Sequence, residues 1–219
     1  MIVLYVVILI QIRRKEIMKK MISGAVMSLG VLLAGVSSAS AAEHPYLKDS
    51  NGNPIDSYKK YYMEAYEFPG QRLAYENEAV KLGSGPGEKI GVYFPSADYP
   101  NTSPELVHLK TERTWGEDEE PGYSSPYWLV ANPANNRVEL GYGFNTNAKG
   151  YWTATKPSED MDPDFVARNY YAFKSWYFDE NNPNNKHHKF MSYRNSDGWL
   201  NVDQATMNSK TMWRFIPAQ

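Results

Sequence analysis

The feature that most constrains the fold of this chain is a unit of about 60 residues that occurs three times, a period typical of repeat architectures. Val80–Gly83 (VKLG) is echoed by Val138–Gly141 (VELG) and again by Leu200–Asp203 (LNVD), at a nearly constant spacing. A proline follows the last apolar run of each unit at a similar spacing: Pro95, Pro157 and Pro217. Such a repeat predicts three equivalent units that share one core.

Each unit contains four short runs in which apolar and polar residues alternate between turn residues, the pattern of half-buried strands. The twelve expected strands are Tyr61–Tyr66, Arg72–Tyr75, Ala79–Leu82, Lys89–Phe94, Glu105–Lys110, Tyr127–Ala131, Arg137–Leu140, Tyr151–Thr155, Tyr170–Tyr177, Lys189–Tyr193, Trp199–Asp203 and Met212–Ile216. No long run in these units has the spacing of an amphipathic helix. The sequence therefore predicts an all-β domain with three sets of four strands.

The N-terminal region has the layout of a bacterial-type secretory signal peptide over residues 18–41. A basic start at Lys19–Lys20 precedes an apolar run over residues 25–36 and a small-residue cleavage site at residues 39–41. Cleavage after Ala41 leaves a single domain over residues 42–219, which we expect to be secreted. We interpret residues 1–17 as an upstream extension ahead of a true start at Met18. The alternative for the Arg13–Arg14 pair is a twin-arginine export signal.

The charge of the expected mature chain and its lack of cysteine exclude several classes of function. It holds 18 Lys and Arg against 24 Asp and Glu, a net charge of −6, which disfavours binding to nucleic acid or to anionic membranes. With no cysteine, thiol catalysis and Cys-based zinc sites are excluded. No carboxylate pair or Ser–His–acid pattern indicates an enzyme, and we expect a monomer without a cofactor.

Neither candidate metal motif has the pattern that a metal requires. Asp160–Asp164 resembles the start of a calcium loop, but Phe165 stands where glycine is needed and Tyr171 where glutamate is needed. His187 and His188 are neighbours on an expected strand, so their side chains point to opposite faces. We therefore expect an acidic surface loop and no metal site.

The start of the expected mature chain resembles a known family. Leu47–Ile55 (LKDSNGNPI), followed closely by Tyr61–Met63 (YYM), is similar to the N-terminal signature of the soybean-trypsin-inhibitor (Kunitz-type) β-trefoils. Arg137–Gly141 and Gly150–Trp152 are similar to the middle repeat of that family. The resemblance implies a β-trefoil, a fold with twelve strands in three pseudo-equivalent units.

The resemblance also implies inhibition of an extracellular protease, of the serine type rather than the cysteine type, through the loop after the fourth strand. The matching segment is 95–104, with Tyr99 as the anchor for a chymotrypsin-like pocket and Ser57 as the residue that supports the loop. The loop candidates are Ala97, Asp98, Tyr99, Pro100 and Asn101.

Several residues of this segment depart from the family pattern. The loop has no Lys or Arg, so trypsin is not the expected target, and Pro100 removes the backbone N–H after Tyr99. Ser57 stands where the family usually has asparagine, and the usual disulfides are absent. An ordinary proline-rich connector is the alternative interpretation of this segment.

The alternative function is a carbohydrate-binding or cell-surface-binding module, such as a lectin-like domain or a toxin accessory, because aromatic faces stack on the apolar faces of sugars. The candidate exposed aromatics are Trp115, Tyr123, Tyr127, Tyr142 and Phe144. The tryptophans on expected strands should instead pack inside the domain: Trp128, Trp152, Trp199 and Trp213. The Q-x-W repeat of ricin-type trefoil lectins is absent, which disfavours that lectin class.

Overall fold

The computed structural model describes residues 43–98, 103–115, 124–142, 150–175, 177–179 and 182–219. The chain divides into two units, Met1–Ser40 and Ala41–Gln219, and all of the described residues belong to the second. Within the described residues, no helix is long and apolar enough to cross a membrane.

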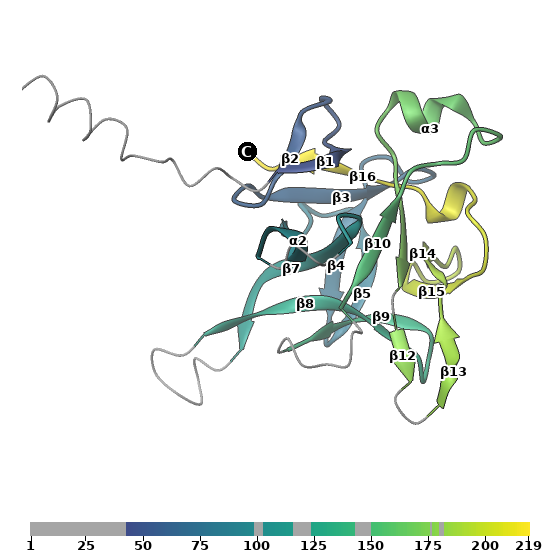
Figure 1. Cartoon of the computed structure of the whole chain (residues 1–219). Helices are drawn as coiled ribbons and strands as arrows, with labels where there is room; N and C mark the ends of the chain where they lie inside the picture. Colours follow the sequence, from purple (N-terminus) through teal and green to yellow (C-terminus); the bar gives the residue numbers. More distant parts are fainter. Residues whose placement is uncertain (1–42, 99–102, 116–123, 143–149, 176, 180–181) are drawn as a thin grey trace, which may run out of the picture. The chain divides into compact units, whose positions relative to one another are not determined.

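The described residues of the second unit form strands and three short helices (Figure 1). In chain order the elements are β1 (Glu43–Lys48), β2 (Pro54–Asp56), β3 (Tyr61–Ala65), β4 (Arg72–Glu76), β5 (Ala79–Gly83), β6 (Ile90–Tyr93), α2 (Pro95–Asp98), β7 (Leu106–Trp115), β8 (Ser125–Asn132), β9 (Arg137–Gly141), β10 (Trp152–Thr155), α3 (Pro163–Ala167), β11 (Ala172–Ser175), β12 (Tyr177–Asp179), β13 (Asn182–His187), β14 (Phe190–Tyr193), β15 (Leu200–Gln204), the 3-10 helix η1 (Ser209–Thr211) and β16 (Trp213–Pro217).

Six strands close a barrel. β3 pairs with β6, β6 with β7, β7 with β10 and β10 with β11, while β16 pairs with β3 along its whole length. Two backbone hydrogen bonds between Tyr171 and Trp213, of 2.8 and 2.9 Å, close the ring between β11 and β16. Closure removes the unpaired edges that an open sheet would expose.

Three hairpins, β4–β5, β8–β9 and β14–β15, contact one another through a threefold set of backbone hydrogen bonds. The Leu82 N–H donates to the Gly198 carbonyl (2.9 Å), and the Leu140 N–H donates to the Glu78 carbonyl (2.7 Å). The third bond runs from the Val202 N–H to the Asn136 carbonyl (2.8 Å). Each donor is the third residue of one of the repeated segments, so the architecture is an all-β trefoil and the predicted repeat is confirmed.

The barrel interior is filled by side chains at equivalent positions of the repeats. Trp152 and Trp213 are fully buried, and their indole N–H groups donate to the Leu129 carbonyl (2.9 Å) and the Met191 carbonyl (3.1 Å). Trp128 is also buried, as the sequence predicts. Trp199 is only half-buried, because it lies at the contact between hairpins with the cations of Lys81 and Arg137 near its ring.

One prediction at the level of elements needs correction. The expected strand over residues 170–177 is two strands, β11 and β12, and β12 leaves the barrel to form a separate hairpin with β13. Segment 95–104, for which the sequence allows an inhibitory loop or a proline-rich connector, begins with helix α2. Pro95 is its first residue, a position where proline loses no hydrogen bond and its fixed φ suits a helix.

Candidate functional site

Two of the predicted ligand-binding aromatics, Tyr127 and Tyr142, are brought together by the fold. Their ring centroids are 6.5 Å apart and their planes meet at 83°. Tyr142 is 58% exposed, whereas Tyr127 is half-buried and packs partly against the core. One aromatic ring is therefore held against another and still presented to solvent.

The register of the β8–β9 hairpin explains this pairing. Trp128 lies opposite Gly141, so the residues just outside this pair, Tyr127 and Tyr142, face each other where the hairpin ladder ends. A Cβ atom at Gly141 would lie 2.7 Å from a methyl carbon of Val130. Glycine at this position therefore permits the close approach of β9 to β8 that sets the tyrosines side by side.

The other three aromatic candidates stay predictions. The backbone of Trp115 ends β7 and pairs with Ser125 of β8, the strand that carries Tyr127. Tyr123 and Phe144 lie outside the described residues. In sequence they flank the same two strands, since Tyr123 precedes β8 and Phe144 follows β9.

The predicted inhibitory segment is only partly described. Ala97 and Asp98 form the end of α2, while Tyr99, Pro100 and Asn101 lie outside the described residues. Phe94, just before α2, is buried at 3% exposure. At the other end the Leu106 N–H donates to the Ser103 carbonyl (3.1 Å), and the Ala154 N–H donates to the Glu105 carbonyl (3.0 Å).

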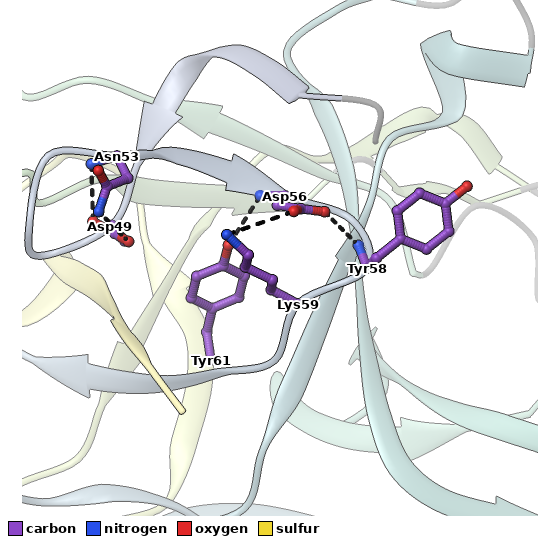
Figure 2. Close-up of polar contacts among 6 residues, drawn as sticks. All are labelled: Asp49, Asn53, Asp56, Tyr58, Lys59 and Tyr61. Atoms are coloured by element: carbon purple, nitrogen blue, oxygen red, sulfur yellow. Dashed lines mark hydrogen bonds and ion pairs between the residues drawn. The ribbon is translucent and has the colours of Figure 1, made fainter. Parts of the chain in front are cut away.

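Ser57, the predicted loop support, lies half-buried in the turn between β2 and β3. Its neighbour Asp56 organises that turn. An Asp56 carboxylate oxygen accepts the Tyr58 N–H (2.8 Å), as Figure 2 shows. The Asp56 carbonyl accepts the Lys59 N–H (3.1 Å). The Asp56 N–H donates to the Tyr61 hydroxyl (2.9 Å). Burial raises the pKa of Tyr61, so this hydroxyl stays protonated.

The braced turn presents Tyr58 to solvent at 72% exposure, and the sequence did not predict this residue as an exposed aromatic. Figure 2 shows its ring pointing away from the other five labelled side chains. The sequence signal was present, because an aspartate whose side chain accepts the N–H two residues on is a common way to fix a turn.

The acidic segment Asp160–Asp164 has a structural role. The Asp162 carboxylate accepts the Asp164 N–H (2.9 Å) and caps α3, with Pro163 as the first helical residue. Among the described residues, no group of three or more His, Asp or Glu side chains could hold a metal ion.

No family model matches the chain, and no curated protein sequence matches it. Its fold, in contrast, is similar to that of several solved structures. The receptor-binding domain of botulinum neurotoxin D superposes with a TM-score of 0.56 at 13% identity, over 80% of this chain and 45% of that one. Alocasin, a protease inhibitor from Giant Taro (Arum macrorrhizon), gives 0.53 at 12% identity, over 78% of this chain and 98% of that one.

The BEL β-trefoil gives a TM-score of 0.51 at 12% identity, over 81% of this chain and 100% of that chain. The present chain spans about 45% of the length of the neurotoxin domains it matches. The neighbours thus include both an inhibitor and a receptor-binding domain, and at 11–13% identity neither function is favoured. What these likenesses show is the fold: the chain is a β-trefoil protein.

Proposed function

We propose that this protein is a secreted, non-enzymatic binding module that recognises carbohydrate through Tyr142 and Tyr127. The observation that carries the proposal is the exposed ring of Tyr142, held by the edge-on ring of Tyr127 where the β8–β9 hairpin ends. The apolar face of a sugar ring stacks on such an aromatic face, and a ring already fixed by its neighbour loses little freedom on binding.

Two further points support a carbohydrate ligand. A protein exported by the signal peptide that the sequence predicts over residues 18–41 would meet glycans outside the cell. A botulinum neurotoxin D ligand-binding domain that superposes on 87% of this chain was solved in complex with N-acetylneuraminic acid, with a TM-score of 0.53. N-acetylneuraminic acid should therefore be included among the first glycans tested.

The test is a glycan array probed with the purified protein, followed by calorimetry on the best ligand. Tyr142→Ala should weaken binding at least tenfold, about 1.4 kcal/mol. Tyr58→Ala removes another exposed tyrosine from a different turn and should leave the affinity unchanged. If no glycan binds, or if both variants lose affinity equally, the proposal fails.

Protease inhibition through segment 95–104 is the second candidate, and the two pinned ends of that segment favour it. Buried Phe94 fixes one end, and the hydrogen bonds of Ser103 and Glu105 fix the other. A segment held at both ends loses little entropy when a protease binds it, which is how inhibitory loops gain affinity.

Titration of chymotrypsin, subtilisin, elastase, trypsin and papain with the protein tests this second candidate. Stoichiometric inhibition of one serine protease, lost in Tyr99→Ala and kept in Tyr58→Ala, would establish it. Absence of inhibition at micromolar concentration would remove it and leave the carbohydrate proposal standing.

A further inference from the structure

A pocket of about 350 Å³ opens near the junction of β1, α3 and β11, and neither the tyrosine pair nor the predicted inhibitory segment contributes to it. The residues that line it are Lys48, Lys156, Pro157, Val166, Asn169, Tyr170 and Tyr171. They come from the end of β1, from the segment after β10, from α3 and from the segment that leads into β11. This volume is at the lower end of the range for small-molecule sites, and it suits one sugar ring.

The lining of the pocket is cationic. Lys48 and Lys156 are among its lining residues, and no Asp or Glu is. Two lysines in the lining of one concave surface contribute positive potential there. On a chain whose expected mature form has a net charge of −6, two lysines without a lining carboxylate would attract an anion, although the Asp49 carboxylate lies close enough to Tyr171 to act on its hydroxyl.

The pocket walls are held by hydrogen bonds. The Lys48 N–H donates to the Tyr171 hydroxyl (2.9 Å), and Tyr171 is itself fixed by its two backbone bonds to Trp213. Burial raises the pKa of Tyr171, so the hydroxyl keeps a hydrogen to donate. The part of the lining formed by Tyr171 therefore belongs to the closed barrel and is in place before any ligand binds.

The remaining lining residues favour a ligand with both hydroxyl groups and an apolar face. Asn169 offers an amide that can donate and accept, at a backbone φ of 57° fixed by its N–H bond to the Val166 carbonyl (3.2 Å). Val166 is 57% exposed and Pro157 lies with it at the pocket, so both offer apolar surface to a ligand.

From these features we infer that the pocket binds a carboxylate-bearing sugar residue of the uronic acid type. The carboxylate lies between the Lys48 and Lys156 ammonium groups, the hydroxyl groups reach Asn169 and Tyr171, and the apolar face of the ring covers Val166. This site shares no residue with the Tyr127–Tyr142 pair, so the two binding proposals can be confirmed or refuted separately.

The experiment is an amide ¹H–¹⁵N titration of the protein with glucuronate, with glucose as the neutral match and sulfate as the simple anion. Glucuronate should produce saturable shifts at Lys48, Asn169, Tyr170 and Tyr171. Glucose should bind at least tenfold more weakly, and raising the salt concentration should weaken glucuronate binding.

Variants identify the residues responsible. Lys48→Gln and Lys156→Gln should each weaken glucuronate binding about fivefold or more, while Lys59→Gln, which removes an exposed lysine in the β2–β3 turn, should not. Tyr142→Ala should leave the titration unchanged. A retained, dispersed spectrum confirms that each variant is folded.

Four outcomes would overturn the inference, and the first three are no saturable shift with glucuronate, equal affinity for glucose, and full affinity in both pocket lysine variants. Sulfate that binds as tightly as glucuronate would also overturn it, because the pocket would then recognise charge alone.

Discussion

At the scale of single residues, His108 is a titratable side chain buried among aromatic rings. It is 5% exposed and lies among the rings of Tyr93, Trp128 and Tyr151, at centroid distances of 5.8, 5.4 and 4.1 Å. Burial lowers its pKa to about 4, because the charged imidazolium would lose its hydration there. The folded protein therefore holds a neutral histidine at pH values where an unfolded chain holds a charged one.

This depressed pKa predicts a loss of stability in mild acid. As the pH falls from about 6.5 to 4, the unfolded chain takes up a proton that the folded chain does not, so the free energy of unfolding decreases by on the order of 3 kcal/mol. Above about pH 6.5 this contribution is fully retained. Urea unfolding at pH 7.5 and pH 4.5 measures the decrease.

His108→Phe provides the comparison, since phenylalanine keeps an aromatic ring at the site and cannot titrate. The variant should lose about 2.5 kcal/mol less than the wild type between the two pH values. Equal losses in the two proteins, or an imidazole resonance that titrates near pH 6.5 in the folded protein, would contradict the assignment.

The residues of the candidate binding sites were the hardest feature to predict from the sequence. Tyr142 was predicted to be exposed because it lies in a glycine-rich loop, and the structure agrees. Tyr58 was not predicted because it lies in a short turn rather than in a long loop. The pocket at Lys48, Lys156 and Asn169 is formed by segments that are distant in the sequence, so no local sequence pattern predicts it.

At the scale of elements, alternation and turn residues located all twelve strands of the main sheet, with 170–177 extended too far. The hairpins β1–β2 and β12–β13 were not predicted. Residues Asn182–His187 read NPNNKH, a loop composition, and they are extended only because β12 pairs with them. Helices α2 and α3 have no long amphipathic run to predict them, although each begins with a proline.

The turn between β2 and β3 gives a prediction at this scale. Asp56→Ala removes the carboxylate that accepts the Tyr58 N–H, and should lower the free energy of unfolding by about 1 kcal/mol. Asp56→Asn keeps an acceptor and loses only the 3.7 Å ion pair to Lys59, whose side chain is 70% exposed, so it should cost far less.

Ser57→Ala in the same turn is the matched control, with an expected change within about 0.5 kcal/mol. Denaturant unfolding of the three variants measures the differences. An alanine at residue 56 with no more effect than the alanine at residue 57 would mean that the carboxylate does not brace the turn.

At the scale of the whole molecule, the near-constant spacing of the three repeated segments predicted the threefold arrangement, because equivalent donors must recur at equivalent positions. How the ring closes was not visible in the sequence. Glu64 on β3 accepts two hydrogen bonds from the Arg214 guanidinium on β16, at 2.9 and 2.5 Å, and the N–H of Gly70 at 2.8 Å. The side chains of this ion pair are only 7% and 17% exposed.

Breaking this pair should be costly. Arg214→Met leaves the Glu64 carboxylate buried without its cation, and should lower the free energy of unfolding by about 3–5 kcal/mol. Arg113→Met breaks the exposed pair with Glu88 and should cost less than about 1 kcal/mol. A loss below about 1 kcal/mol for Arg214→Met, measured by urea unfolding, would show that the pair does not hold the closure together.

The pairing of β16 with β3 also sets an order of events during translation. Glu64 and Arg214 are 150 residues apart, so at about 5–20 residues per second β3 leaves the ribosome roughly 8–30 s before its partner strand does. Throughout that interval one edge of β3 has no strand to pair with. An unpaired strand edge is a template for pairing with other chains, so this edge of β3 is open to such pairing until β16 is made.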